Sequence, residues 1–192
     1  MQAIQGLFTL ACAATVSALA LALPGAAVQE TPPQMPQPTE HHKQILAGVG
    51  EWEGTLTTFK DGVAETPIAA HETVVGIGGF WTQSTFKCDF MGQPYHGTGA
   101  FGYDVTKRRF VGTWADSMSS HLAVMEGQMD PKTKTVVMRW EGPDMTGATV
   151  PHRYEAVHNP DSYTSTFFAG PGDGTKTMVI EMKRKAGAGA GR

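Results

Sequence analysis

The stretch PYHGTGAFGYDVTKRRFVGTWAD, residues 94–116, decides the fold. On each side of a polar turn at residues 104–107, side chains alternate between larger apolar residues and small or polar ones. Tyr95, Phe101 and Tyr103 fall on one face of the first segment, with Gly97 and Gly99 between them. Period-two alternation interrupted by turn residues predicts two β-strands joined by a short connection.

The same texture continues over most of the chain. About ten such segments follow one another between residues 51 and 185, joined by short turns and without helical segments between them. This order favours consecutive antiparallel pairing. Ten strands are many for an open sheet, so closure is expected to remove the unpaired edges. The sequence therefore predicts an all-β fold, namely a ten-stranded antiparallel barrel. A barrel of more than eight strands tends to enclose a cavity.

The beginning of the chain predicts export. Residues 1–27 contain an uncharged run of small and apolar residues that ends in Pro-Gly-Ala-Ala, which is typical of a secretory signal peptide. A membrane anchor, or a lipoprotein attached at Cys12, are the alternatives. We expect cleavage, no membrane span in the mature chain, and a periplasmic or secreted location.

Three further segments complete the predicted organisation. Residues 28–38 are rich in Pro and Gln and predict an extended tether. Thr39 is suited to cap a short N-terminal helix with Ile45 and Leu46 on its buried side. The barrel domain is expected over residues 39–185, and the Ala/Gly-rich residues 186–192 are typical of a disordered tail.

Composition excludes several function classes. The net charge is −3 and the Lys and Arg residues are scattered, so we expect no nucleic-acid partner. After cleavage Cys88 is the remaining cysteine, which leaves no internal disulfide. The strand histidines form no H-x-H pair that would bring metal ligands together, so no metal site is expected.

A short motif resembles a known barrel family. GEWEG, residues 50–54, is similar to the G-x-W signature of the first strand in lipocalins and their calycin relatives. The resemblance implies that Trp52 plugs the closed end of the barrel. It also implies that a basic residue of the last strand, from the pair Lys183 and Arg184, covers this tryptophan.

A longer resemblance covers nearly all of the chain from Pro38 to Lys185. The segments PTEHHKQILAGVGEWEG, FKCDFMGQPYHGTGAFGYDVTKRRFVGTWADSMSSHLAVMEG and KTVVMRWEGPDMTG resemble the bacterial family called domain of unknown function 1579. The resemblance implies a calycin-like β-barrel and no established activity.

The nitrobindins are more distantly similar. They share a ten-stranded barrel and a G-x-W-x-G start, and they bind haem through a histidine of the final strand. Here Thr175, Lys176 and Thr177 occupy that stretch. We therefore expect no cofactor, with His152 or His158 as the remaining alternatives for haem.

Alternation along the strands suggests residues that line the barrel. Phe86, Trp114, Glu126, Trp140 and Tyr154 are the candidates for binding a small apolar or amphipathic molecule. Methionine is common near them and adapts its shape to irregular apolar ligands. A barrel filled by its own side chains would instead hold no ligand.

Two alternative functions remain open. TWADSMSSHL, residues 113–122, brings Asp116 and His121 close in sequence, and with Glu126 they could serve a small hydrolase or isomerase. However, Asp and Ser in a tight connection are typical of a hairpin tip, and no G-x-S-x-G motif accompanies them. The second alternative is a ligand-free barrel that interacts with partners in the cell envelope.

Overall fold

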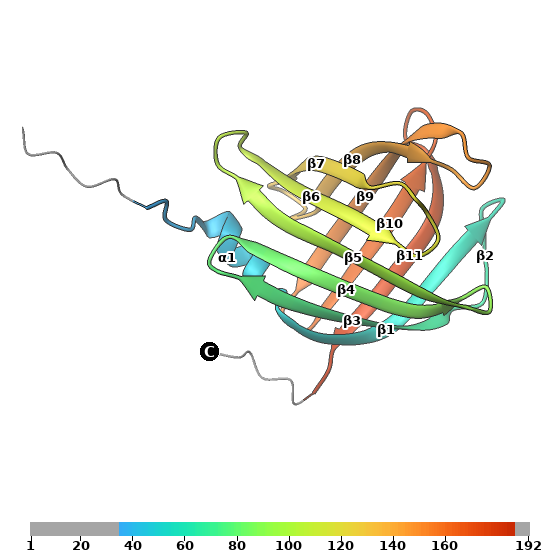
Figure 1. Cartoon of the computed structure of the whole chain (residues 1–192), viewed down its shortest axis with the longest axis horizontal. Coiled ribbons are helices and arrows are strands. Elements are labelled where there is room, and N and C mark those ends of the chain that lie inside the picture. Colours follow the sequence, from blue (N-terminus) through green and yellow to red (C-terminus); the bar gives the residue numbers. More distant parts are fainter. Residues whose placement is uncertain (1–34, 187–192) are drawn as a thin grey trace, which may run out of the picture. The chain divides into compact units, whose positions relative to one another are not determined.

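The structure, a computed structural model, describes residues 35–186 and is a closed β-barrel with one short helix (Figure 1). The predicted signal peptide, most of the predicted tether and nearly all of the predicted tail lie outside the described residues. In chain order the elements are α1 (Glu40–Leu46), β1 (Gly50–Lys60), β2 (Val63–Ala64), β3 (Ile68–Ile77), β4 (Trp81–Phe90), β5 (Gln93–Asp104), β6 (Arg109–Asp116), β7 (Ala123–Met129), β8 (Val136–Pro143), β9 (Thr149–Asn159), β10 (Ser162–Ala169) and β11 (Thr175–Arg184).

Ten of these strands form the barrel wall, which confirms the predicted fold. From β3 to β11 each strand pairs antiparallel with the next, β1 pairs with β3, and β11 returns to pair with β1. The two-residue β2 only extends a hairpin at the end of β1. The decisive stretch forms most of β5 and all of β6, and their pairing aligns Thr98 with Ala115 and Phe101 with Gly112.

The helix α1 lies at the end of the barrel where β4 begins and β5 ends (Figure 1). Thr39 is its N-cap, as predicted, and the Thr39 backbone N–H donates to Nδ1 of His42 at 2.9 Å. The most buried side chain of α1 is His42, at 2% exposure, whereas Ile45 and Leu46 are half-buried. The rings of Phe80 and Tyr103 enclose His42, which explains this difference.

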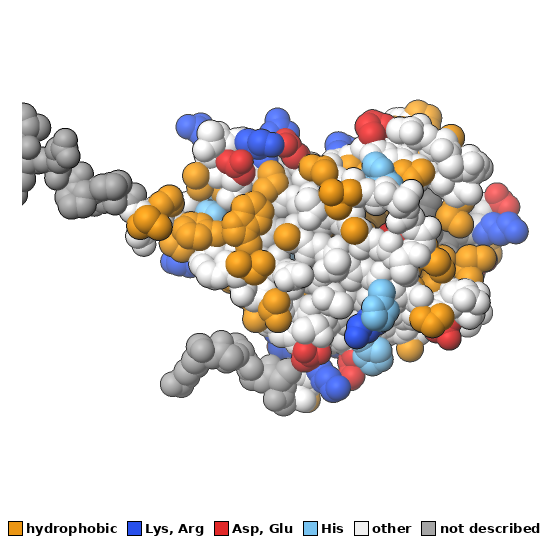
Figure 2. Space-filling view, in the orientation of Figure 1, with side chains coloured by type: hydrophobic (Ala, Val, Ile, Leu, Met, Phe, Trp, Pro, Cys, Tyr) orange, Lys and Arg blue, Asp and Glu red, His pale blue; other side chains and the backbone are white. Residues whose placement is uncertain are grey.

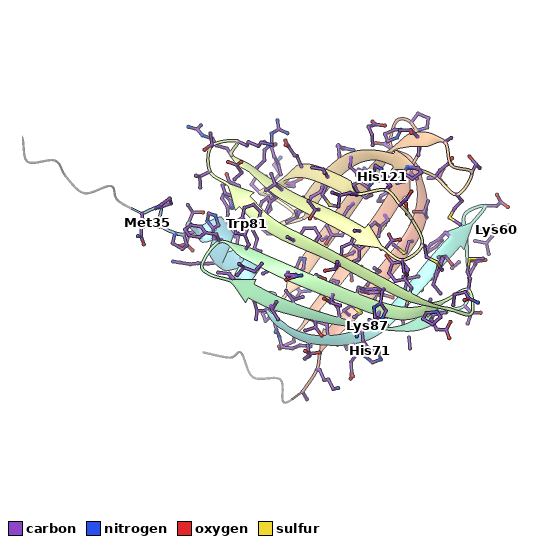
Figure 3. All side chains as sticks on the ribbon, viewed as in Figure 1. Met35, Lys60, His71, Trp81, Lys87 and His121 are labelled. Carbon is purple, nitrogen blue, oxygen red and sulfur yellow. The ribbon has the colours of Figure 1, made fainter. Side chains whose placement is uncertain are left out.

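Strand alternation separates an inner face from an outer face. On β3 and β4, His71 and Lys87 are paired neighbours on the exposed outer face (Figure 3). Side chains one position away point inward and are more buried. The buried apolar residues form two clusters, one with Trp52, Leu56, Ala70, Phe86, Tyr163, Ile180 and Met182, and one with Phe110, Ala123, Met125 and Met138.

Hydrophobic side chains also gather on the outer surface near α1 (Figure 2). Val75, Ile77 and Trp81 are 47%, 49% and 39% exposed there. The indole of Trp81 packs against the backbone of Gly102, where a Cβ atom would lie 2.3 Å from the ring. Trp81 lies on the outer face of the barrel wall, because its side chain is exposed whereas that of the next residue, Thr82, is buried. No helix within residues 35–186 has the length and apolar character required to cross a membrane.

The first and last strands are joined by Arg184. Its guanidinium lies 4.2 Å from the ring centroid of Trp52, which is 2% exposed. The same group donates to the carbonyl oxygens of Ala47 at 2.9 Å, Val49 at 2.8 Å and Pro160 at 3.1 Å. The basic residue over Trp52 is thus Arg184, while Lys183 points to solvent.

Replacing Arg184 with Ala should destabilise the barrel by about 2–3 kcal/mol, because carbonyl groups lose a charged donor and Trp52 loses its cover. The matched variant Lys183→Ala removes the neighbouring positive charge on the outer face. It should change the free energy of unfolding by no more than about 0.5 kcal/mol. Urea unfolding of both variants measures this difference, and equal losses would contradict the assigned role of Arg184.

Candidate functional site

A cavity of about 860 Å³ runs along the inside of the barrel. It extends from Gln44 and Ile45 of α1 to Ser119 and His121 in the β6–β7 connection. Most of the surrounding side chains are apolar, among them Leu56, Val74, Phe86, Phe90, Phe101, Phe110, Trp114, Met125, Met129, Met138, Phe167, Met178 and Ile180. The barrel is therefore hollow and not filled by its own side chains.

Glycines on the inner wall let large rings lie flat and leave this space open. A Cβ atom at Gly97 would lie 2.3 Å from the Trp114 ring, and one at Gly99 would lie 2.7 Å from it. Likewise, a Cβ atom at Gly112 would lie 2.5 Å from Phe101. The rings thus occupy the volume that wall side chains would have filled.

Near the end that Trp52 closes, the cavity borders a carboxyl group, Glu72. It lies on β3 directly opposite Trp52 of β1. Ser84 of β4 donates its hydroxyl hydrogen to one carboxyl oxygen of Glu72, and Tyr163 of β10 donates to the other. Because β1 and β11 separate β3 from β10 in the barrel, the Tyr163 bond passes across the inner face of the closing strands.

Burial changes the protonation of this group. Glu72 is half-buried and borders the cavity. Loss of solvation raises the pKa of Glu72, although the two hydroxyl donors oppose that rise. Burial and the adjacent carboxyl group also raise the pKa of Tyr163 far above its usual range, so this phenol keeps its hydrogen.

Two more ring side chains extend this polar region. Burial raises the pKa of Tyr154 to about 12, and Ser165 donates to the Tyr154 hydroxyl at 3.2 Å. Burial lowers the pKa of His158, whose ring stacks on Tyr163 with centroids 5.2 Å apart. His158 and the phenols are therefore neutral at pH 7, and Glu72 is the group of this cluster able to carry charge. We call Glu72, Ser84, Tyr154, His158, Tyr163 and Ser165 the inner polar cluster.

The opposite end of the cavity has a different character. The indole N–H of Trp114 donates to the Tyr95 hydroxyl at 3.1 Å, and burial raises the pKa of Tyr95. Trp140 stacks on His152 with ring centroids 5.0 Å apart. Aromatic rings thus surround this end, where Asp116 and His121 also border the cavity (Figure 3 labels His121).

Four of the five predicted lining residues border the cavity, namely Phe86, Trp114, Trp140 and Tyr154. Glu126 does not. It lies on the outer surface, where its carboxylate forms an ion pair with Lys107. On β7 the residues Ala123 and Met125 face inward, and this places Glu126 outside together with Val124, which is 63% exposed.

The three residues of the enzyme alternative are not brought together. Asp116 and His121 lie at the cavity, whereas Glu126 is on the other side of the barrel wall. Asp116 Oδ1 accepts from the backbone N–H of Met118 at 2.9 Å. Ser119 Oγ accepts from the backbone N–H of His121 at 3.0 Å, and β7 begins only at Ala123. These are the backbone contacts of a hairpin tip.

Tyr154 and His158 of the inner polar cluster were among the residues singled out from the sequence, whereas Glu72, Ser84, Tyr163 and Ser165 were not. A signal was present on β3, where Glu72 shares its face with Ile68, Ala70 and Val74 while the other face carries His71 and Thr73. A lone carboxyl group on an otherwise apolar face indicates a buried polar position. No three His, Cys, Asp or Glu side chains within residues 35–186 are grouped as a metal site would require.

The fold and cavity define a hollow ten-stranded antiparallel β-barrel. The family model described as protein of unknown function (DUF1579) matches residues 37–185, and the chain belongs to this family. No curated protein matches the chain. The crystal structure of Rv2717c from M. tuberculosis is similar, with 11% sequence identity and a TM-score of 0.55. The match covers 78% of this chain and 99% of that one, and at this identity it shows a common fold alone.

Replacing Glu72 with Gln should change how stability depends on pH. The pKa of Glu72 lies above its ordinary value of 4.5 in the folded state, so the folded state holds the proton more tightly than the unfolded state. The stabilisation of the folded state that results from this tighter proton binding is fully present below pH 4.5 and is lost as the pH rises through the raised pKa. The difference in Tm, Glu72→Gln minus wild type, should therefore become more positive as the pH is raised from about 4 to about 8. Melting curves of both proteins that stay parallel over this interval would contradict the assignment.

Proposed function

We propose that this protein is a binding protein that holds a small apolar or amphipathic molecule inside its barrel. The observation that carries the proposal is the cavity of about 860 Å³, which lies within the range of small-molecule sites. Its wall is mainly apolar, and its polar groups are concentrated in a few places. Methionines such as Met125, Met138 and Met178 give the wall adaptable contacts.

An unsatisfied polar atom supports the same proposal. Among the described residues, Nε2 of His121 is a buried side-chain atom without a hydrogen-bond partner. His121 borders the cavity. Buried polar atoms are normally paired, so a polar group of a bound molecule would supply the missing contact. With the predicted signal peptide at residues 1–27, we propose that binding takes place in the periplasm or outside the cell.

Filling the cavity should weaken binding of an apolar dye. Ala156 is 1% exposed and borders the cavity, so the larger side chain of Ala156→Leu would enter it. We expect the affinity for the neutral dye N-phenyl-1-naphthylamine to fall about tenfold, since the dye loses volume and apolar contact. Fluorescence titration of the full chain measures the affinity.

The matched control is Val157→Leu. Val157 is the next residue of β9 and points outward, with 40% exposure, so the same new side chain there leaves the cavity unchanged. Its dye affinity should equal that of wild type, and circular dichroism verifies that both variants fold. A wild-type protein that binds no dye, or equal weakening in both variants, would contradict a binding site inside the barrel.

A further inference from the structure

The inner polar cluster sets the chemistry of the molecule that the cavity would hold. We infer that the cavity selects an amphipathic molecule with a cationic amine at one end, and that Glu72 binds this amine. The inference rests on the proposed function, because it names the ligand class of the same cavity.

Acidic side chains outnumber Lys and Arg side chains among the described residues that border the cavity. Among the described residues that border the cavity, the acidic groups are Glu72 and Asp116, and the Lys or Arg residue is Lys134 in the β7–β8 turn. Lys134 is exposed on the surface. The guanidinium of Arg184 is held by the carbonyl groups of Ala47 and Val49 and by the face of Trp52. An anionic head group would thus meet a carboxyl group in the inner part of the cavity, without a cation placed to receive it.

Glu72 also has hydrogen-bond acceptor positions that its two donors do not use. A carboxylate offers about four lone-pair positions, and at Glu72 the hydroxyl groups of Ser84 and Tyr163 use one on each oxygen. The remaining positions accept hydrogen bonds, as does the oxygen of the Tyr154 phenol. An alkylammonium group carries three donors and no acceptor, which matches a set of free acceptors.

A bound amine would favour the ionised form of Glu72. An unpaired carboxylate is costly in an apolar interior, and an adjacent cation favours its ionised form. In the low dielectric of the barrel this attraction is stronger than in water, and the existing donors from Ser84 and Tyr163 hold the carboxylate in place. The apolar tail of the molecule would then extend past Leu56 and Phe86 toward the aromatic end of the cavity.

Three straight-chain probes of twelve carbon atoms test the inference: dodecylamine, dodecan-1-ol and dodecanoate, each below its micelle concentration or solubility limit. Isothermal titration with the full chain at neutral pH should give an affinity for dodecylamine about tenfold or more above that for dodecanoate. Glu72→Gln should reduce dodecylamine affinity by about tenfold or more and leave dodecan-1-ol affinity within about threefold. This ranking in wild type is informative even if the variant does not fold.

Two carboxyl variants are matched controls. Glu126→Gln makes the same change on the outer surface and should leave all three affinities unchanged. Asp116→Asn removes the carboxylate at the other end of the cavity and should affect dodecylamine less than Glu72→Gln does. A larger loss in Asp116→Asn, or equal binding of amine and carboxylate by wild type, would overturn the inference. If dodecan-1-ol and the dye bind without an amine preference, only this inference fails, whereas binding of no probe at all would also reject the proposed function.

Discussion

The pairing of β1 with β11, covered at one end by the contact between Arg184 and Trp52, is the constraint on which the closed barrel depends. A sheet of ten strands becomes a barrel only when its two edges meet, and here the last residue of β11 covers the first tryptophan of β1. Arg184 also ties down the chain that leads from α1 into β1 through the carbonyl groups of Ala47 and Val49. One side chain therefore connects the end of the closing strand pair to the segment that follows α1.

The open cavity inside the barrel depends on glycine residues of the inner wall. Gly97 and Gly99 accept the flat indole of Trp114, and Gly112 accepts the ring of Phe101. If these positions carried larger residues, the rings would project inward and occupy the space that now forms the cavity. The hollow interior is thus a result of pairing large rings with glycines on neighbouring strands, and the polar cluster at Glu72 uses the room that remains.

The sequence was sufficient for the fold because alternation and turn residues act locally. The decisive stretch predicted β5 and β6, and the repeated pattern predicted consecutive pairing and closure. Inner and outer faces were harder to assign where both faces of a strand are apolar. On β7, Val124 and Met125 are equally plausible core residues by sequence, and for this reason Glu126 was expected inside. The contact between Glu72 and Tyr163 could not be predicted, because 91 residues separate the partners and two strands lie between them.

The placement of the tryptophans has an optical consequence. The chain has four of them, and Trp52, Trp114 and Trp140 border the cavity while Trp81 lies on the outer wall. Any change in the polarity of the interior reaches three indoles at once, and the fourth stays in its own environment. The intrinsic emission of the protein therefore carries an internal reference, and replacing Trp81 with Phe would leave a spectrum that reports on the interior alone.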